Sequence, residues 1–281
     1  MSVEAILLGV AQDGGVPHTG CDCARCRRAW EDPSFRQWAV CLGLVDRDRH
    51  QSWLIDATPH FPEQLHTLRE FAPDCPLAGI LLTHAHIGHY AGLIHLGREV
   101  MGVEEMPVYA TSRMADFLRD NGPWSLLVTL RNIDLRILTP EVETALSPDL
   151  HVTPYCVPHR DELSDTIAFV VRGPSRQLFY CPDIDSWGRW NYDLREFLTG
   201  IDIALLDATF FSADELPGAD MRVVPHPPVV ETVERLAGID CDVWLIHLNH
   251  TNPLLGPGRE RDWVEERGFR VGAAGERWAL G

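Results

Sequence analysis

The sequence predicts an α/β protein in which strands and helices alternate, an order that suits a four-layer αβ/βα sandwich. Several short runs are apolar from end to end, as expected for strands buried on both faces of a sheet. Helical stretches lie between these runs, and no internal repeat, low-complexity tract or long linker interrupts them. A length of 281 residues is ordinary for one two-sheet α/β domain with a large core. We therefore treat residues 1–281 as a single domain.

The individual elements follow from the same patterns. The first expected helix begins after Thr58-Pro59-His60, where Pro62 is tolerated near the first turn. The proline-rich segment at 225–228 marks a loop before a helix rather than a domain boundary. The apolar runs predict strands at Val3–Val10, Ala39–Val45, Ser52–Asp56, Ala78–Leu82, Pro107–Ala110, Leu135–Leu138, His151–Val157, Thr166–Arg172, Gln177–Cys181, Ile203–Asp207, Val243–His247 and Phe269–Val271. The stretches between them predict helices near Pro62–Phe71, Tyr90–Met101, Arg113–Asn121, Tyr192–Thr199, Pro228–Ala237 and Gly258–Glu266.

Charge and composition restrict the class of partner. The net charge of −17 and the pI near 5.1 argue against broad nucleic-acid binding, which needs Lys and Arg to replace the counterions of phosphates. They do not exclude an anionic substrate, because bound metal ions set the local field of a site. No signal segment precedes the first strand and no run of about eighteen apolar residues occurs, so we expect a cytoplasmic protein without a membrane partner.

Three histidines in six residues follow the apolar run Ala78–Leu82. His84, His86 and His89 therefore lie where a buried strand ends and the chain turns. A neutral imidazole offers a nitrogen lone pair near pH 7, so histidines clustered at a strand end suit a transition metal. This spacing predicts a metal site.

Three further candidate ligands also follow strands. His159 comes after the run ending at Val157, Asp183 after Cys181, and His247 after Ile246. Taken singly, each has an alternative interpretation as a turn residue. The ordered set, however, favours convergence on the same site.

A cluster of thiols follows the first strand. Cys21, Cys23 and Cys26 are three thiols in six residues, and only a fourth ligand is missing for a tetrahedral zinc ion. His250 is the best candidate because it lies one short turn beyond His247. Free or disulfide-bonded cysteines are the alternative, although thiols this close rarely have disulfide geometry. We expect a zinc knuckle at residues 21–26.

The histidine segment resembles the His-x-His-x-Asp-His signature of the metallo-β-lactamase fold, with Gly88 in place of the aspartate. The resemblance covers nearly the whole chain and implies the αβ/βα sandwich. It also implies that His84, His86 and His159 hold one metal, while His89, Asp183 and His247 hold or share a second. The thiol cluster is similar to that of two subfamilies, the B protein of pyrroloquinoline quinone biosynthesis and the cyclic-phosphate phosphodiesterase of phosphonate breakdown. In the latter, such a set with a late histidine holds a structural zinc.

The resemblance implies a zinc-dependent hydrolase that uses a metal-activated water. Gly88 weakens the second site, which leaves iron or manganese open there. His89, His247 and Asp183 form a two-histidine, one-carboxylate set, so a non-haem iron oxygenase or a cofactor carrier of quinone biosynthesis stays an alternative. A cyclic-phosphate phosphodiesterase is another, and a metal-binding protein without turnover is the simplest.

Other residues have weaker indications. Asp183 is expected to bridge the metals, and His226 matches a loop histidine that donates a proton in the phosphodiesterase subfamily; its alternative is a solvated loop residue. Asp56 and Asp207 are expected to orient ligands, and Asp13 to shape a turn before Gly14. Aromatic residues near presumed loops leave room for an aromatic or anionic small-molecule substrate. A homodimer is one allowed assembly. These aromatic residues are Tyr90, Trp124, Trp187, Trp190, Phe210 and Phe211.

Overall fold

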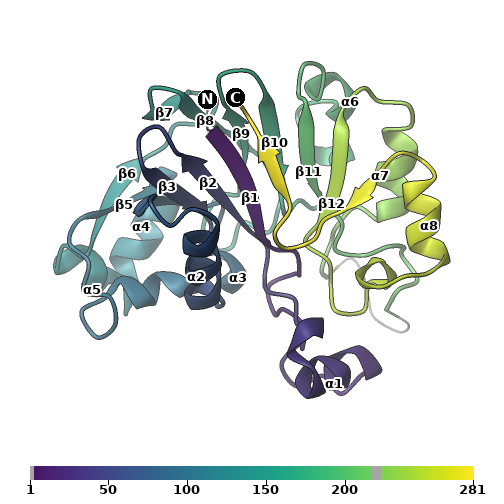
Figure 1. The fold of residues 1–281 in the computed structure, drawn as a ribbon, viewed down its shortest axis with the longest axis horizontal. Coiled ribbons are helices and arrows are strands. Elements are labelled where there is room, and N and C mark those ends of the chain that lie inside the picture. Colours follow the sequence, from purple (N-terminus) through teal and green to yellow (C-terminus); the bar gives the residue numbers. More distant parts are fainter. Residues whose placement is uncertain (1–2, 217–222) are drawn as a thin grey trace.

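Two seven-stranded mixed sheets pack face to face in the computed structural model, which describes residues 3–216 and 223–281 (Figure 1). The first sheet has the order β14-β1-β2-β3-β4-β5-β6 and the second has the order β13-β12-β11-β10-β9-β8-β7. The strands of the first sheet are β1 (Val3–Gly9), β2 (Cys41–Asp46), β3 (Gln51–Ile55), β4 (Leu77–Leu81), β5 (Met106–Ala110), β6 (Ile133–Ile137) and β14 (Arg277–Ala279). Those of the second are β7 (Thr144–Ser147), β8 (Leu150–Cys156), β9 (Ile167–Arg172), β10 (Gln177–Cys181), β11 (Ile203–Asp207), β12 (Asp242–Ile246) and β13 (Arg270–Val271).

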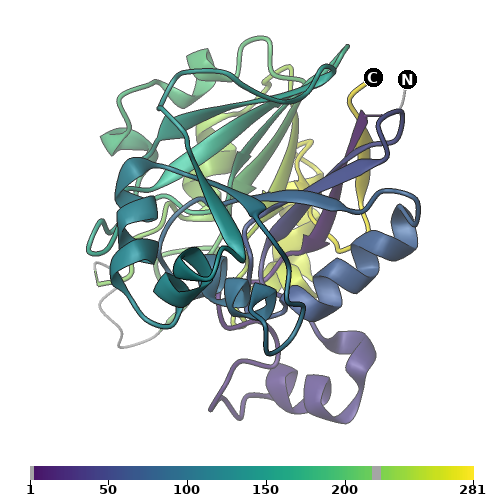
Figure 2. The same cartoon turned by 90° about the vertical axis from the view of Figure 1, so that its left-hand side faces the viewer.

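Helices cover the outer faces of both sheets (Figures 1 and 2). The α-helices are α1 (Ala24–Glu31), α2 (Phe61–Phe71), α3 (Ile87–Tyr90), α4 (Ser112–Asp120), α5 (Trp124–Thr129), α6 (Leu194–Phe197), α7 (Val229–Arg235) and α8 (Arg259–Glu265). Short 3-10 helices are η1 (Pro33–Phe35), η2 (Ala91–Leu96), η3 (Trp187–Arg189) and η4 (Pro253–Leu255). The predicted four-layer αβ/βα sandwich is confirmed. None of the helices in the described ranges has the length and hydropathy that crossing a membrane requires.

Burial on both faces explains why the central strands are largely apolar. In β1, Ala5 and Leu7 point into the core between the sheets, whereas Ile6 and Leu8 point into the core under α2 and α4. A third core lies between the second sheet and α6 to α8. Each fully buried aliphatic side chain of this kind contributes roughly 1.5–3 kcal/mol, so both faces of each central strand stabilise the sandwich.

Strand direction brings the candidate ligands to one edge. Strands β3 to β6 run parallel to one another, as do β10 to β13, so their carboxyl ends lie together. The two sheets are joined there, because Leu248 donates to the carbonyl of Val10 (2.8 Å) and Gln12 donates to that of Leu248 (2.9 Å). The chain after β1 and the chain after β12 are therefore fixed side by side.

The helix expected over Tyr90–Met101 is wrong in its type and length. The α-helix ends at Tyr90 and the chain continues as η2. Gly92 lies against the carbonyl of Thr58, where a built Cβ would be 2.2 Å from the oxygen. Only glycine fits at this close approach of two chain segments.

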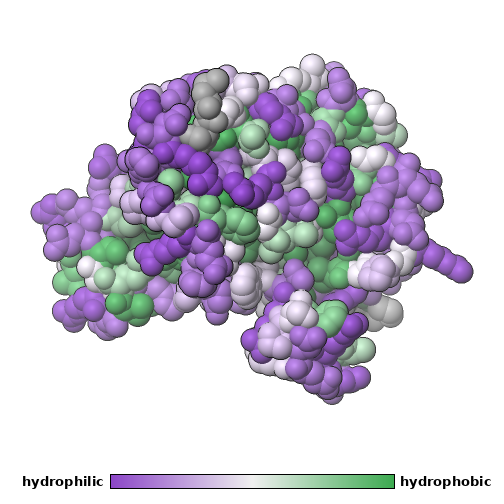
Figure 3. Space-filling view, in the orientation of Figure 1, coloured by the Kyte–Doolittle hydropathy of each residue, from purple (hydrophilic) through white to green (hydrophobic). Residues whose placement is uncertain are grey.

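The patterns also missed elements that bury little apolar surface. Helix α1 buries only Cys26 and Ala29, and it projects from the body on the side opposite both chain ends (Figures 1 and 2). The short edge strands β7 and β14 and the helix α5 were likewise not expected. Hydrophobic side chains gather over α5 in Figure 3, where Leu126 and Leu130 are exposed.

Candidate metal centres

The thiol cluster converges with His250 beside α1. Cys23 caps the helix by accepting from the backbone N–H of Cys26, which turns both sulfurs to the same side. The Sγ atoms of Cys21, Cys23 and Cys26 lie 3.6, 3.9 and 3.7 Å from Nδ1 of His250. Zinc bond lengths place sulfur and nitrogen about 3.6 Å apart in a tetrahedral site. The four side chains therefore fit one zinc ion.

The thiols of this cluster differ in their acidity. Burial and the neighbouring thiols raise the pKa of the Cys26 thiol to about 11, whereas at Cys23 the effect of burial is outweighed by hydrogen bonds from Cys26 and Cys21, which lower the pKa. Burial, together with the charges of His18 and Arg25, lowers the pKa of His250 and favours the neutral imidazole that binds metal. The structure describes these cysteines as free thiols, so the disulfide alternative is wrong.

A second cluster is buried between the carboxyl ends of the two sheets. His84 follows β4, His86 is the N-cap of α3, His159 follows β8 and Asp183 follows β10. His86 Nδ1 lies 2.9 Å from His84 Nε2 and 3.0 Å from His159 Nε2. Asp183 Oδ2 lies 3.3 and 3.2 Å from the Nε2 atoms of His84 and His159. Ligands of one tetrahedral zinc ion are about 3.3 Å apart, so this set fits a first metal centre.

A third group lies next to the second. The Nε2 atoms of His89 and His247 are each 3.9 Å from Asp183 Oδ2, which places Asp183 between the two groups. Within the described part of the chain, these two nitrogens are buried without a hydrogen-bond partner. An unpaired buried polar atom costs roughly 1–3 kcal/mol, whereas a metal ion would use both lone pairs. The residues present therefore fit a second metal.

Asp13 is a member of this group that sequence reasoning missed. It does shape a turn, in which Gly15 N–H donates to the Gln12 carbonyl (2.8 Å). Its Oδ1, however, lies 3.1 Å from His89 Nε2 and 3.7 Å from His247 Nε2. The absence of a carboxylate at Gly88 was the one signal that another acid had to be sought.

Buried acceptors fix the far nitrogen of several histidines. Asp56 Oδ2 lies 2.7 Å from His89 Nδ1, and Asp185 Oδ1 lies 2.9 Å from His159 Nδ1. The orienting position expected for Asp56 is where the structure places it, whereas Asp185 was not foreseen. Such contacts leave Nε2 free with its lone pair.

His247 is oriented through a hydroxyl. Thr209 Oγ1 donates to Asp207 Oδ1 (2.7 Å) and lies 2.7 Å from His247 Nδ1. Because its single hydrogen is directed to Asp207, this hydroxyl accepts from Nδ1–H. His247 also has a positive φ of 62°, and Asp56 has one of 73°; such backbone conformations are costly and cluster at functional sites.

His226 lies beside both groups. Its side chain is 2% exposed and its ring centroid is 5.8 Å from those of His159 and His247. Its Nδ1 is 2.7 Å from Asp207 Oδ2. Burial alone would lower the pKa of His226, but the charges of Asp207 and Asp183 outweigh it and raise the pKa to about 9. The alternative of a solvated loop histidine is wrong.

Comparison with known proteins decides the family. Residues 52–248 match the model of the beta-lactamase superfamily domain, well over half of the chain. The chain belongs to the beta-lactamase superfamily.

Relatives narrow the resemblance within the superfamily. Coenzyme PQQ synthesis protein B of Methylobacterium sp. (strain 4-46) is 26% identical over 306 residues, covering 99% of this chain and 97% of that protein. The crystal structure of Zn(2+)-bound PqqB from Methylobacterium extorquens matches with a TM-score of 0.84 at 24% identity, covering 99% of this chain and 100% of that one. A diphosphatase of the PhnP family matches with a TM-score of 0.71 at 22% identity, covering 99% of this chain and 97% of that one. The metallo-β-lactamase fold and the resemblance to the quinone-biosynthesis subfamily are thus confirmed.

Most of the aromatic residues that the sequence places near loops belong to the apolar cores of this superfamily member. Trp187 and Trp190 are buried in the core between the second sheet and its helices, and Tyr90 packs against Trp124. Phe210 lies next to the site, with its ring centroid 5.7 Å from that of His226. Apolar side chains in loops are as often core as pocket, and sequence does not separate the two.

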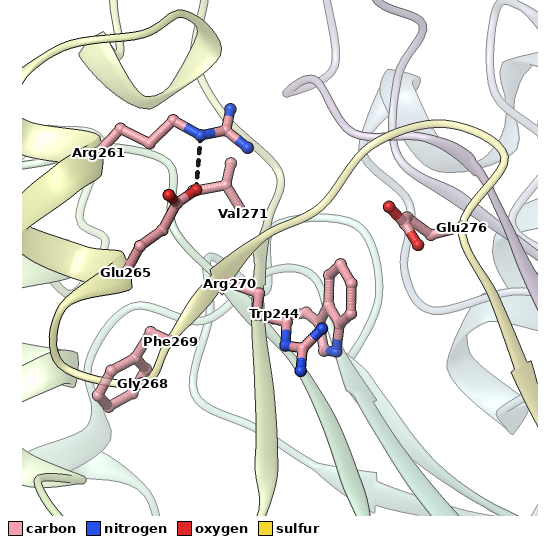
Figure 4. Close-up of a pocket in the computed structure, with 8 residues that line it drawn as sticks. All are labelled: Trp244, Arg261, Glu265, Gly268, Phe269, Arg270, Val271 and Glu276. Carbon is pink, nitrogen blue, oxygen red and sulfur yellow. Dashed lines mark hydrogen bonds and ion pairs between the residues drawn. The ribbon is translucent and has the colours of Figure 1, made fainter.

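A hollow of about 450 Å³ lies elsewhere on this superfamily member (Figure 4). It is formed by β12, β13, α8 and the loop before β14, and Arg270 lies over the indole of Trp244 in it. None of the eight residues drawn there is a histidine or a cysteine. The residues that line this hollow are therefore of other types than the ligands of the metal centres.

Proposed function

We propose that the protein is a metal-dependent hydrolase of a small-molecule substrate, with zinc in the first centre. The observation that carries this proposal is the complete set of His84, His86, His159 and Asp183, whose donor atoms are spaced as zinc ligands. A zinc ion bound there would lower the pKa of a coordinated water, so that hydroxide is available near neutral pH.

The protein's own residues then orient the groups and move the proton. Asp183 is shared between the two metal groups and positions them relative to each other. His226, held by Asp207, has its Nε2 available to donate a proton to the leaving oxygen of an ester or phosphodiester. Asp185 and Asp56 hold the imidazoles of His159 and His89 in one tautomer.

The substrate class follows from charge. The chain is acidic overall, but a doubly metallated centre is locally positive and favours an anionic group. The resemblance to PQQ synthesis protein B supports a substrate from quinone-cofactor biosynthesis, and the similarity to a PhnP-family diphosphatase supports phosphoester chemistry. A cytoplasmic location and the absence of nucleic-acid and membrane partners stay predictions.

A specific observation also favours a second candidate, an oxygenase. Asp13, His89 and His247 supply two histidines and one carboxylate, the ligand type of non-haem iron oxygenases, although Asp183, between the two groups, would add a second carboxylate. The fold is shared with the CmlA β-hydroxylase, which matches with a TM-score of 0.55 at 13% identity. Iron in the second centre would support this candidate.

The test is chelator-sensitive turnover of bis-nitrophenyl phosphate and a nitrophenyl ester, combined with metal analysis. A zinc-loaded protein that hydrolyses either substrate, and a His84→Ala variant that does not, would support the hydrolase. The exposed Asp48→Asn variant, which removes one carboxylate far from the centres, is the control. Oxygen consumption with Fe(II) and no hydrolysis would favour the oxygenase. Tight quinone binding without either reaction would favour a carrier.

A further inference from the structure

Gly88 and Asp13 compete for the same space. A Cβ built on Gly88 would lie 2.1 Å from Asp13 Oδ1 and 2.6 Å from Asp13 Cα. No side chain can extend from position 88 while Asp13 keeps its place. The aspartate of the His-x-His-x-Asp-His signature is therefore absent from α3. The carboxylate of Asp13, on the loop after β1, occupies the same space.

We propose that Asp13 is the carboxylate ligand of the second metal, together with His89, His247 and Asp183. The ligand has moved from α3 to the loop after β1. This inference rests on the proposed function only in requiring that the buried centre binds metal.

The distances suit a shared ion. Asp13 Oδ1 lies 3.1 Å from His89 Nε2 and 3.7 Å from His247 Nε2, while Asp183 Oδ2 lies 3.9 Å from each nitrogen. Zinc–oxygen and zinc–nitrogen bonds of about 2.0–2.2 Å separate two ligand atoms by about 3.3–3.6 Å. The observed spacings bracket that range.

The orientation argues against a simple hydrogen bond. Asp13 Oδ1 and His89 Nε2 are close, yet both are buried atoms without a hydrogen-bond partner in the described part of the chain. Among the described residues, His247 Nε2 is likewise buried without a hydrogen-bond partner. These atoms lie close together, but their geometry is not that of a hydrogen bond. Ligand atoms around a shared metal ion have this arrangement. The Nδ1 of His89 is meanwhile occupied by Asp56, so Nε2 is the ring nitrogen that faces Asp13.

The surrounding chain holds Asp13 in this place. The turn from Gln12 to Gly15 is closed by a backbone hydrogen bond, and Gly15 has a φ of 66°, which favours glycine. Residue 12 is bonded to Leu248, next to His247. The loop that carries Asp13 is therefore fixed against the segment that carries another ligand of the same group.

The experiment measures metal binding rather than turnover. The whole chain is stripped and titrated with Co(II), and zinc content is measured by plasma mass spectrometry on protein purified without chelator. Asp13→Asn keeps the size of the side chain but removes the charge. Gly88→Ala leaves Asp13 present but places a methyl group where its carboxylate lies. Asp48→Asn is the matched control for loss of one negative charge.

We expect the parent and Asp48→Asn to bind about three metal ions per chain, one of them in the knuckle, which the thiolate bands of Co(II) identify. Asp13→Asn and Gly88→Ala should each lose one ion, or bind it more than ~100-fold more weakly, because orienting residues alone change affinity 10–100-fold. The knuckle bands should persist in both and show that each variant is folded.

Full metal content and unchanged affinity in Asp13→Asn would overturn the proposal. So would a Gly88→Ala variant that binds like the parent, and this second variant decides the matter if Asp13→Asn does not fold. Parent protein that binds metal only in the knuckle would overturn this inference and the proposed function together. Parent protein with a full metal complement but no hydrolysis would overturn the proposed function alone.

Discussion

The two metal-binding regions of this protein are built in opposite ways. The knuckle takes three of its four ligands from six consecutive positions on a partly exposed arm, and only the fourth, His250, from the segment after β12. The buried centre takes its ligands from the ends of strands in both sheets, so it requires the complete sandwich. Three thiols and one imidazole close the knuckle, a ligand set that is typical of a structural zinc site. The histidine and carboxylate centre is the one whose ligand types suit a reactive metal.

The largest difference should appear on removing one ligand of the first centre. His84→Ala should lower kcat/KM by at least ~1000-fold, because water without the metal keeps a pKa far above 7. Knuckle metal should change little. Turnover of a nitrophenyl substrate and zinc content measured on the same preparation check this, and activity within tenfold of the parent would contradict it.

The second-largest effect on activity should follow substitution of the proton donor. His226→Gln should lower kcat about 100–1000-fold for substrates with a poor leaving group, since general acid catalysis contributes ~10²–10⁴-fold. Nitrophenolate leaves without a proton, so nitrophenyl substrates should be affected much less. Metal content should equal that of the parent. Equal losses with both leaving groups would show that His226 supports the centre in another way.

A weaker effect on metal binding is expected from a residue that contacts a metal ligand but not the metal itself. Asp185→Asn alters the partner of His159 Nδ1 and should weaken zinc binding in the first centre about 10–100-fold. Competition with a fluorescent zinc chelator measures this affinity. Asn keeps the shape of the side chain but has one acceptor oxygen for two donors, His159 Nδ1–H and Arg189, so an unchanged melting temperature is needed to separate the loss from a local collapse.

The smallest effect on activity should follow damage to the knuckle. Cys23→Ser removes a zinc ligand but leaves a hydroxyl that can cap α1, so the melting temperature should fall by at least about 5 °C through loss of the metal alone. Turnover should fall only a few-fold at low temperature. A knuckle variant as inactive as His84→Ala would remove the distinction between a structural and a reactive centre.

Sequence predicts ligands best when they follow recognisable strands. His84, His159, Asp183 and His247 each come after an apolar run, and parallel strands bring their ends together. The residues around Asp13 are explained by its role in a turn. They do not indicate that it contacts His89, which lies 76 positions later in the sequence. A contact of this range depends on how the two sheets are joined.

The fold was predictable to the same extent and for the same reason. Strands buried on both faces, such as β1 and β10, have continuous apolar sequences. Helix α1 buries two residues and β14 is three residues long, so neither leaves a periodic pattern. The buried positions of Trp187 and Trp190 depended on which face of a loop meets the core, which composition does not encode.

The hydrogen bonds of Leu248 with Val10 and Gln12 have a consequence for metal loading. The segment after β1 continues to Asp13 and then to the thiols. The segment after β12 runs from His247 to His250. Each of the two short segments thus contributes to both centres. Zinc in the knuckle should therefore order the segments on which the second ion depends, and linkage requires the second ion to favour the knuckle zinc by the same factor. Under zinc limitation, the protein would fill and empty as a cooperative unit.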